Sequence, residues 1–187
     1  MEDTPLVKGE IISGQTCISD KNIIHELEQK GYGEIEKEKL FLKQFETLYL
    51  LYAKRLILKK GNKQFDFNSF MSLSQKTNPE ILTKFLIYRD LRNRGYVVKD
   101  GFGFGSDFRV YERGDFGEKG AKFLIFGLNE GQKEKMGNLQ KKIEEITQMG
   151  KEPIIAVIER RGEIIYYKIN IMNFNENKAR LQESFQL

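Results

Sequence analysis

Residues 78–98 read NPEILTKFLIYRDLRNRGYVV, and this stretch sets how the second half of the chain folds. Asn78 predicts an N-cap, Pro79 predicts the first helical position, and Gly95 predicts the end of the helix. Apolar residues recur between them at helical spacing, and from Tyr96 the pattern changes to the period of two that is typical of a strand. We therefore expect a long helix that leads directly into a β-sheet.

Further helix and strand patterns lie on both sides of this helix. Downstream, the sequence predicts strands at 96–98, 108–111, 121–128, 154–159 and 164–172, and a helix at 135–148. Upstream, it predicts a strand at 7–13, a helix at 21–30 with Asp20 as N-cap, a helix at 42–55, a strand at 56–58, a short helix from Asn68 and a linker at 72–77. These patterns predict the α+β class: a small N-terminal α+β domain (residues 1–75), followed by a C-terminal domain (residues 76–187) in which helices flank a mixed sheet.

The composition is that of a globular protein. The chain has 187 residues, of which 40% are hydrophobic, so it is long enough for one ordinary domain or two small ones. Its longest apolar runs, such as residues 153–158, are far shorter than the roughly 18 residues that a membrane-spanning helix requires. Residues 1–5 are polar and acidic and do not resemble a secretory signal. We expect a protein that works in the cytoplasm and has no membrane segment.

Cysteine and histidine are scarce. The single cysteine, Cys17, has no partner for an internal disulfide. One cysteine and one histidine, His25, are too few ligands for a zinc site built from these residues. His25 lies on an expected helix with no acid or base partner at helical spacing, which favours a partly exposed residue over a catalyst. We expect neither a metal nor another cofactor.

Positive charge exceeds negative charge only slightly. The chain has 31 Lys and Arg against 27 Asp and Glu, a net charge of +4 that permits a polyanionic partner without requiring one. Four arginines, Arg89, Arg92, Arg94 and Arg113, lie among aromatic residues, a combination that suits RNA because cations bind phosphates and rings stack on unpaired bases. The same arginines are also typical of a solvated helix face, and the sequence leaves both interpretations open.

Alternating glycines at residues 101–105 look like a phosphate-binding loop. A dinucleotide-binding loop needs a glycine at its sixth position and a helix directly after it, whereas this chain has Ser106 there and an expected strand. We therefore expect a turn between two strands.

The run YRDLRNRGYVVK (residues 88–99), continued by GFGSDFRVY (residues 103–111), resembles the signature of the archaeal tRNA-splicing endonuclease family. The similarity extends more weakly through residues 154–157 and 163–167, so that it covers residues 78 to about 172. The resemblance implies a metal-free enzyme that cleaves precursor tRNA at bulge-helix-bulge motifs. The implied products carry a 2′,3′-cyclic phosphate and a 5′-hydroxyl.

The resemblance also implies a site made of a tyrosine, a histidine and a lysine. Tyr111 matches the tyrosine and Lys151 the lysine, but Gly120 stands at the histidine position, and Glu144 stands where the family has an arginine that grips a bulged base. We therefore favour a structural subunit that pairs with a catalytic paralogue. The alternative is a self-sufficient tRNA-intron lyase in which Lys119 or Lys122 replaces the histidine as acid, although the unperturbed lysine pKa near 10.4 is poorly suited to that role.

The expected final strand has apolar residues on both faces, more than a half-exposed strand of a monomer would carry. With the resemblance, this predicts a hetero-oligomer, two copies of this chain with two catalytic subunits, held chiefly by that strand. A second contact implied by the family, an acidic loop docked in a basic cleft, is less well matched because residues 129–134 contain only two carboxylates. A nucleic-acid-binding module unrelated to splicing is the remaining alternative if the long signature is accidental.

Overall fold

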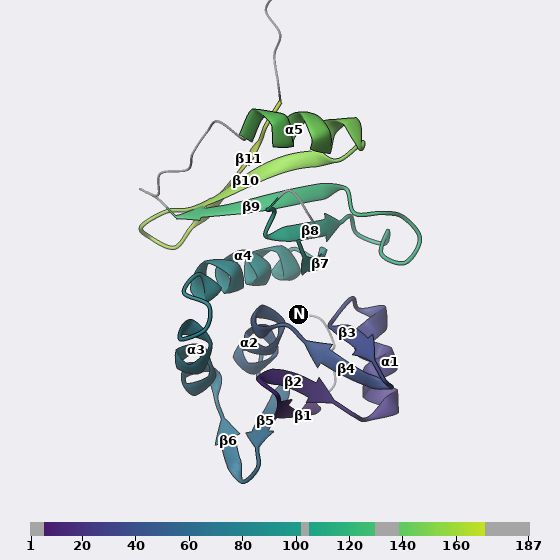
Figure 1. Ribbon diagram of the computed structural model, residues 1–187, viewed down its shortest axis with the longest axis vertical. Helices are drawn as coiled ribbons and strands as arrows, with labels where there is room; N and C mark the ends of the chain where they lie inside the picture. The colour runs from purple at the N-terminus through teal and green to yellow at the C-terminus, as the bar shows by residue number, and fades with distance from the viewer. Residues whose placement is uncertain (1–5, 102–104, 130–138, 171–187) are drawn as a thin grey trace, which may run out of the picture.

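The computed structural model describes residues 6–101, 105–129 and 139–170, which form two mixed sheets and five helices. Figure 1 shows the sheets towards opposite ends of an elongated molecule, with helices α2 and α4 between them. The α+β class is confirmed. The helices are α1 (Lys21–Gln29), α2 (Gln44–Tyr52), α3 (Phe67–Gln75), α4 (Ile81–Asn93) and α5 (Leu139–Gln148).

The first sheet lies in the N-terminal half and has the strand order β3-β4-β2-β1-β5-β6. Its strands are β1 (Val7–Ile12), β2 (Gln15–Ile18), β3 (Glu34–Glu36), β4 (Lys39–Leu42), β5 (Leu56–Lys60) and β6 (Lys63–Phe65). Strands β1 and β5 are parallel, with Val7 opposite Leu56, and the other neighbours are antiparallel. The parallel pair requires a crossover connection, which contains α1 and α2.

Helix ends in this half follow from local chemistry. Asp20 caps α1, as predicted, because its carboxylate accepts from the backbone N–H groups of Asn22 and Ile23. Helix α2 is shorter than the expected 42–55. At its start, Leu42 belongs to β4 and pairs with Thr16 of β2. At its end, Lys54 has a φ of 58°, a left-handed conformation that ends the helix.

The predicted linker at residues 72–77 is wrong for its first four residues, which form the last turn of α3. Two serines explain the difference, because Ser72 donates its hydroxyl to the carbonyl of Asn68 within the helix and Ser74 is buried. A serine-rich stretch therefore continues the helix here instead of ending it.

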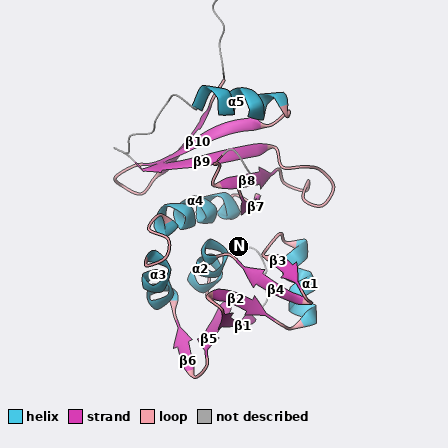
Figure 2. Cartoon of the chain, viewed as in Figure 1, coloured by secondary structure: helices cyan, strands magenta, loops and turns pink. Residues whose placement is uncertain are grey.

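Helix α4 is the central element of the molecule. It packs against α2 and α3 on one side and against the second sheet on the other, as Figure 2 also shows. It begins two residues later than predicted, because Asn78 accepts from the N–H of Glu80 in a preceding turn. Gly95, with a φ of 85°, follows its last turn as predicted.

Both interpretations of Arg92, contact with RNA and a solvated helix face, require an exposed side chain, and both are wrong for this residue. Its side chain is 1% exposed; the guanidinium donates to the carbonyl of Lys30 and lies 4.1 Å from the ring centre of Tyr32. The physical reason is that α4 is covered on both sides, so a position in its last turn can face the N-terminal half instead of water.

A buried carboxylate, that of Glu46, and a partly buried ammonium, that of Lys99, also join the halves at this place. The carboxylate of Glu46 accepts from the N–H groups of Gly33 and Lys43, and the ammonium of Lys99 donates to the carbonyl of Gly33. Burial raises the pKa of Glu46 and lowers that of Lys99. We call Glu46, Arg92 and Lys99 the junction cluster.

The second sheet has the order β11-β10-β9-β8-β7. Its strands are β7 (Val97–Asp100), β8 (Phe108–Tyr111), β9 (Phe123–Asn129), β10 (Glu152–Ile158) and β11 (Ile164–Lys168). Strands β9 and β10 are parallel and the other neighbours antiparallel. Helix α4 covers one face and α5 the other (Figure 1), so the predicted mixed sheet flanked by helices is confirmed.

Several expectations fall on residues outside the described ones. These are the core of the glycine loop (102–104), the rest of the acidic loop (130–134), the start of the helix expected at 135–148, and Ile171 and Met172 of the final strand. Within the described ranges, no helix is long and apolar enough to cross a membrane.

Candidate active site at one end of the second sheet

The sheet topology brings the three predicted site positions to one end of the sheet. Tyr111 ends β8, Gly120 lies three residues before β9, and Lys151 directly precedes β10. Because β8 is antiparallel to β9 and β9 is parallel to β10, the end of β8 and the starts of β9 and β10 meet at the same edge. The ammonium of Lys151 donates to the carbonyl of Ala121 at 2.6 Å, which fixes the lysine beside this segment.

Gly120 leaves an open place in this arrangement. A Cβ atom at position 120 would have only the ammonium of Lys151 within 4 Å, at 3.8 Å, and the backbone there is outside the left-handed region. A side chain at this position would therefore fit and would lie beside the lysine. Glycine itself supplies no group that donates or accepts a proton.

The packing of the Tyr111 ring is a sufficient structural reason for a tyrosine at this position. It is partly buried, and its ring meets that of Phe116 edge to face, with centres 5.1 Å apart. Such a contact anchors the connection that follows β8.

Both lysines that could replace a histidine are engaged in ion pairs. Lys119 lies 2.9 Å from Asp115, and Lys122 lies 2.6 Å from Glu112. The hydrogen bond from Lys122 to Glu112 raises the pKa of the lysine. A proton donor at neutral pH needs a pKa shifted downwards, so the environment of Lys122 works against that role.

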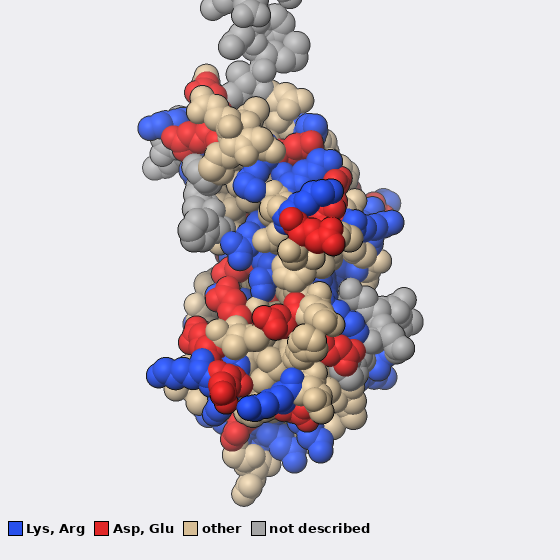
Figure 3. Space-filling model, turned by 90° about the vertical axis from the view of Figure 1, so that its right-hand side faces the viewer, with Lys and Arg blue, Asp and Glu red and all other residues tan. Residues whose placement is uncertain are grey.

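The Glu112–Lys122 pair was missed by sequence reasoning. Its signal lies in the strand register: Val110 is opposite Phe123, so residues 112 and 122 lie near one another where the two strands separate. This pair and Asp115–Lys119 form a second charged group, the loop cluster, on the connection between β8 and β9. Figure 3 views the side from which this connection projects and shows Lys and Arg interspersed with Asp and Glu, not a continuous basic surface.

The four predicted RNA-binding arginines have different environments. Arg92 is buried in the junction cluster and is not accessible to RNA. Arg89 is partly exposed over the rings of Tyr52 and Phe85, and Arg94 is paired with Asp90 through its Nε at 2.8 Å. Arg113 is exposed and lies over the ring of Tyr96.

His25 is far from this site in the fold. It is exposed on α1, where its Nε2 lies 3.0 Å from the amide of Gln29. Among the described residues no group of three or more His, Cys, Asp or Glu could hold a metal ion.

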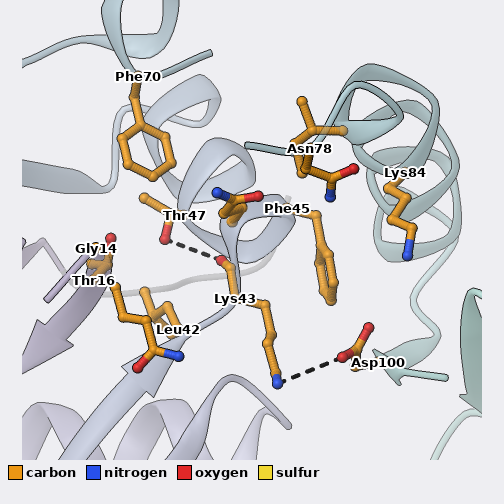
Figure 4. A pocket seen from close by; sticks show the side chains of 13 residues that line it. Gly14, Thr16, Leu42, Lys43, Phe45, Thr47, Phe70, Asn78, Lys84 and Asp100 are labelled. Atoms are coloured by element: carbon orange, nitrogen blue, oxygen red, sulfur yellow. Dashed lines mark hydrogen bonds and ion pairs between the residues drawn. The ribbon is translucent and has the colours of Figure 1, made fainter. Parts of the chain in front are cut away.

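A cavity of about 310 Å³ lies apart from the sheet end, at the seam between the two halves (Figure 4). Two lysines line it, and each is paired: Lys43 lies 3.5 Å from Asp100, and Lys84 lies 3.2 Å from Asp107. Its other lining side chains are largely apolar or amide-bearing, and none of them is a histidine or a cysteine. The Lys43–Asp100 pair crosses the seam and helps to hold the halves together.

Comparison with known proteins covers both halves. Residues 7–71 match the family described as tRNA intron endonuclease, N-terminal domain, and residues 81–166 match tRNA intron endonuclease, catalytic C-terminal domain. The tRNA-splicing endonuclease of Pyrococcus furiosus is 31% identical over 87% of this chain and 95% of its own length. That of Methanococcus maripaludis is 32% identical over 83% of this chain and 88% of its own length.

Proposed function

The chain belongs to the tRNA-splicing endonuclease family, and we propose that it is a non-catalytic subunit of an enzyme that removes introns from precursor tRNA in the cytoplasm. The enzyme would cleave at bulge-helix-bulge motifs and leave 2′,3′-cyclic phosphate and 5′-hydroxyl ends. The observation that carries the structural role is Gly120, an open position beside Lys151 where the family resemblance places the histidine.

The chemistry explains why one missing group matters. Attack of the 2′-hydroxyl on the adjacent phosphate needs a base for the 2′-proton, an acid for the departing 5′-oxygen and a cation for the charge on phosphorus. In our proposal Tyr111 and Lys151 would take two of these roles, and among the described residues at this sheet end none replaces the histidine as the acid. The loss of a general acid costs roughly a hundredfold or more in rate.

The alternative, a self-sufficient lyase with a lysine acid, is less well supported. Lys122 donates to Glu112, which favours its protonated form, and Lys119 is largely exposed and paired with Asp115. The hydrogen bond to Glu112 raises the pKa of Lys122, which is the wrong direction for an acid at neutral pH. We therefore propose that the acid is supplied by a histidine-bearing paralogue, each active site being complete within that subunit.

The assembly we propose contains two copies of this chain and two catalytic subunits. Among the described strands β11 is at the edge of its sheet, with no strand paired to one side of its backbone, and Tyr167 is 52% exposed on it. An exposed ring beside an open edge is an aggregation hazard in a monomer and a natural contact in a complex. Substitution of Tyr167 by Asp is expected to split the complex without loss of helical content.

Arg89, Arg94 and Arg113 are our proposed contacts to the precursor tRNA. Arg94 is the least available of the three because it is already paired with Asp90. The logarithm of the binding constant falls linearly with the logarithm of the salt concentration. Removal of an arginine that binds a phosphate makes this slope less steep by somewhat less than one unit. An unchanged slope in the Arg89→Gln variant would show that Arg89 belongs to a solvated face.

Reconstitution tests the proposal. The chain and a paralogue with an intact histidine are purified separately, mixed, and assayed in EDTA on a bulge-helix-bulge RNA. We expect cleavage only by preparations that contain the paralogue, and the Tyr111→Phe substitution in this chain should leave the rate of the complex within about twofold. A matching substitution in the paralogue should abolish cleavage. Loss of activity in both cases would contradict the structural role.

A further inference from the structure

Two hairpins form the opposite edges of the first sheet, and their charges differ. In the β3–β4 hairpin, Glu36 lies directly opposite Lys39 beside the turn. In the β5–β6 hairpin, Lys60 lies directly opposite Lys63 at the matching place. Opposite charges on facing positions of adjacent strands stabilise a pair of strands, whereas like charges destabilise it. The β5–β6 hairpin therefore keeps a repulsion that the β3–β4 hairpin does not have.

No nearby acid relieves this repulsion. Residues 51–68, from the end of α2 to the start of α3, contain five Lys and Arg residues and a single carboxylate, Asp66. That carboxylate accepts from the backbone N–H and the hydroxyl of Ser69. Within the part of the chain that the structure describes, four exposed lysines of this stretch form no ion pair: Lys54, Lys59, Lys60 and Lys63.

Another stretch is equally basic, but its cations are engaged. Residues 84–99 of α4 and β7 also contain five Lys and Arg residues and one Asp. All but one of these cations are buried or bound to an oxygen atom: Lys84 and Arg94 to carboxylates, Lys99 to a carbonyl, and Arg92 in the junction cluster. The β5–β6 hairpin differs from this stretch because its lysines are exposed and have no carboxylate as a partner.

Protection of the sheet edge explains only part of this pattern. A lysine on an edge strand discourages pairing with a strand of another molecule. This accounts for Lys63, since β6 is at the edge of the sheet. It does not account for Lys59 and Lys60, which lie on β5, between β1 and β6. A ligand with several negative charges would relieve the repulsion and contact all three lysines.

The hairpin offers charge but no ring on which a base could stack. Phe65 of β6 is buried, and the ammonium of Lys63 lies 5.1 Å from the centre of its ring. A lysine is a flexible point charge, and contacts to phosphates carry no sequence information. We infer that Lys59, Lys60 and Lys63 form a contact for the phosphate backbone of RNA. The inference rests on the proposed function and adds a second RNA-binding surface to it.

This surface is separate from the candidate active site. Figure 1 shows the β5–β6 hairpin at the end of the molecule that points away from the second sheet. An RNA held at the end of the second sheet must therefore extend beyond its bulges to reach the hairpin. A paired arm suits this contact because it presents phosphates at close, regular spacing.

Reversal of one charge separates RNA binding from folding. Lys63→Glu places an acid opposite Lys60, which is the arrangement of Glu36 and Lys39 in the β3–β4 hairpin. The midpoint of urea unfolding should therefore stay at the wild-type value or rise, while the affinity for RNA falls. The matched control is Lys37→Glu, the same change of charge at an exposed lysine in the turn of the β3–β4 hairpin.

The full-length variants are titrated at several salt concentrations with a bulge-helix-bulge RNA that has long paired arms, and with a paired duplex of the same length. For Lys63→Glu we expect the affinity for both RNAs to fall roughly tenfold at low salt, and the salt slope to become less steep by about one unit. Lys37→Glu should stay within about twofold of the wild type. Wild-type affinity and slope in Lys63→Glu would overturn the inference, and so would an equal loss in Lys37→Glu, because net charge alone would then explain it.

Failure of the proposed function would give a different result. A wild-type chain that does not prefer bulged over paired RNA, and that adds nothing to cleavage by its paralogue, would reject the splicing role, whereas the salt slope of Lys63→Glu would still decide the hairpin contact. An acidic protein surface is the other possible ligand of these lysines. Normal RNA binding by Lys63→Glu, together with weaker assembly with the paralogue, would assign the hairpin to such a surface and overturn the inference.

Discussion

The junction cluster and the loop cluster contain the same kinds of charged residue but differ in burial, and burial decides what each can do. In the junction cluster, Glu46 and Arg92 are each 1% exposed and are bound mainly to backbone groups. In the loop cluster, the side chains of Glu112 and Lys122 are 43% and 40% exposed and are bound to each other. The first cluster joins the two halves, and the second lies beside the site that, in the proposed function, lacks its acid.

Under the proposed structural role, the comparison teaches that a site of this family can lose its chemistry without loss of its frame. The strand ends, the position of Lys151 and the packing of Tyr111 are all formed, because they follow from sheet topology. The group that the proposal holds to be missing would be a side chain at Gly120, on an exposed connection between two strands. We therefore expect large stability effects at the junction and small ones at the loop.

The largest stability effect is expected at Arg92. Its replacement by Ala removes the hydrogen bond to Lys30 and the contact with Tyr32, and takes away one of the two cations, Lys99 being the other, that act on the carboxylate of Glu46. Loss of one member of a buried charged group typically costs about 3–5 kcal/mol. Urea unfolding measures this cost, and the control is Arg94→Ala, an exposed helix pair for which we expect about 0.5 kcal/mol or less. Equal effects at the two positions would remove the distinction between the clusters.

The second prediction concerns the pH dependence of stability at Glu46. Burial raises the pKa of this carboxyl above its ordinary value of 4.5, so the folded state holds its proton more strongly than the unfolded state does. The contribution of Glu46 is therefore fully present below pH 4.5 and decreases as the pH rises through the raised value. The free energy of unfolding of the wild type, minus that of Glu46→Gln, should decrease between pH 4 and pH 7. A difference that grows over this range would show that the ionised form is the favoured one in the fold.

The smallest effect is expected in the loop cluster. Glu112→Gln removes the partner of Lys122, and an exposed pair of this kind contributes between about 0 and 1 kcal/mol. The pKa of Lys122 should move down towards its ordinary value, which NMR titration of the side chain can follow. The change in unfolding free energy should disappear at high salt because exposed charges are screened. A salt-independent loss as large as that for Arg92→Ala would mean that the loop cluster is part of the core.

Sequence patterns were sufficient for elements whose boundaries are set locally. The cap at Asp20, the end of α4 at Gly95 and the hairpin of β10 and β11 each depend on a few adjacent residues, and the structure confirms them. The site positions Tyr111, Gly120 and Lys151 stay predictions, and the strand order brings all three to the same end of the second sheet.

Features that depend on tertiary packing were not predictable in the same way. The helical period of α4 placed Arg92 on the exposed face, but the N-terminal half covers that face and supplies the carbonyl of Lys30 as its acceptor. Glu46 gave no signal of burial, because its two donors, the N–H groups of Gly33 and Lys43, come together only when α2 docks on the first sheet. Serines at 72 and 74 likewise looked like a linker until their helical partners were known.

The most direct test of the central claim is metal-free cleavage of a bulge-helix-bulge RNA by the purified chain alone, with and without Gly120→His. The open space beside Lys151 should accept the imidazole. We predict no cleavage above background for the wild type and, for Gly120→His, a gain on the order of a hundredfold with 2′,3′-cyclic phosphate ends. Cleavage by the wild-type chain at the rate of the assembled enzyme, unchanged by the histidine, would contradict the account.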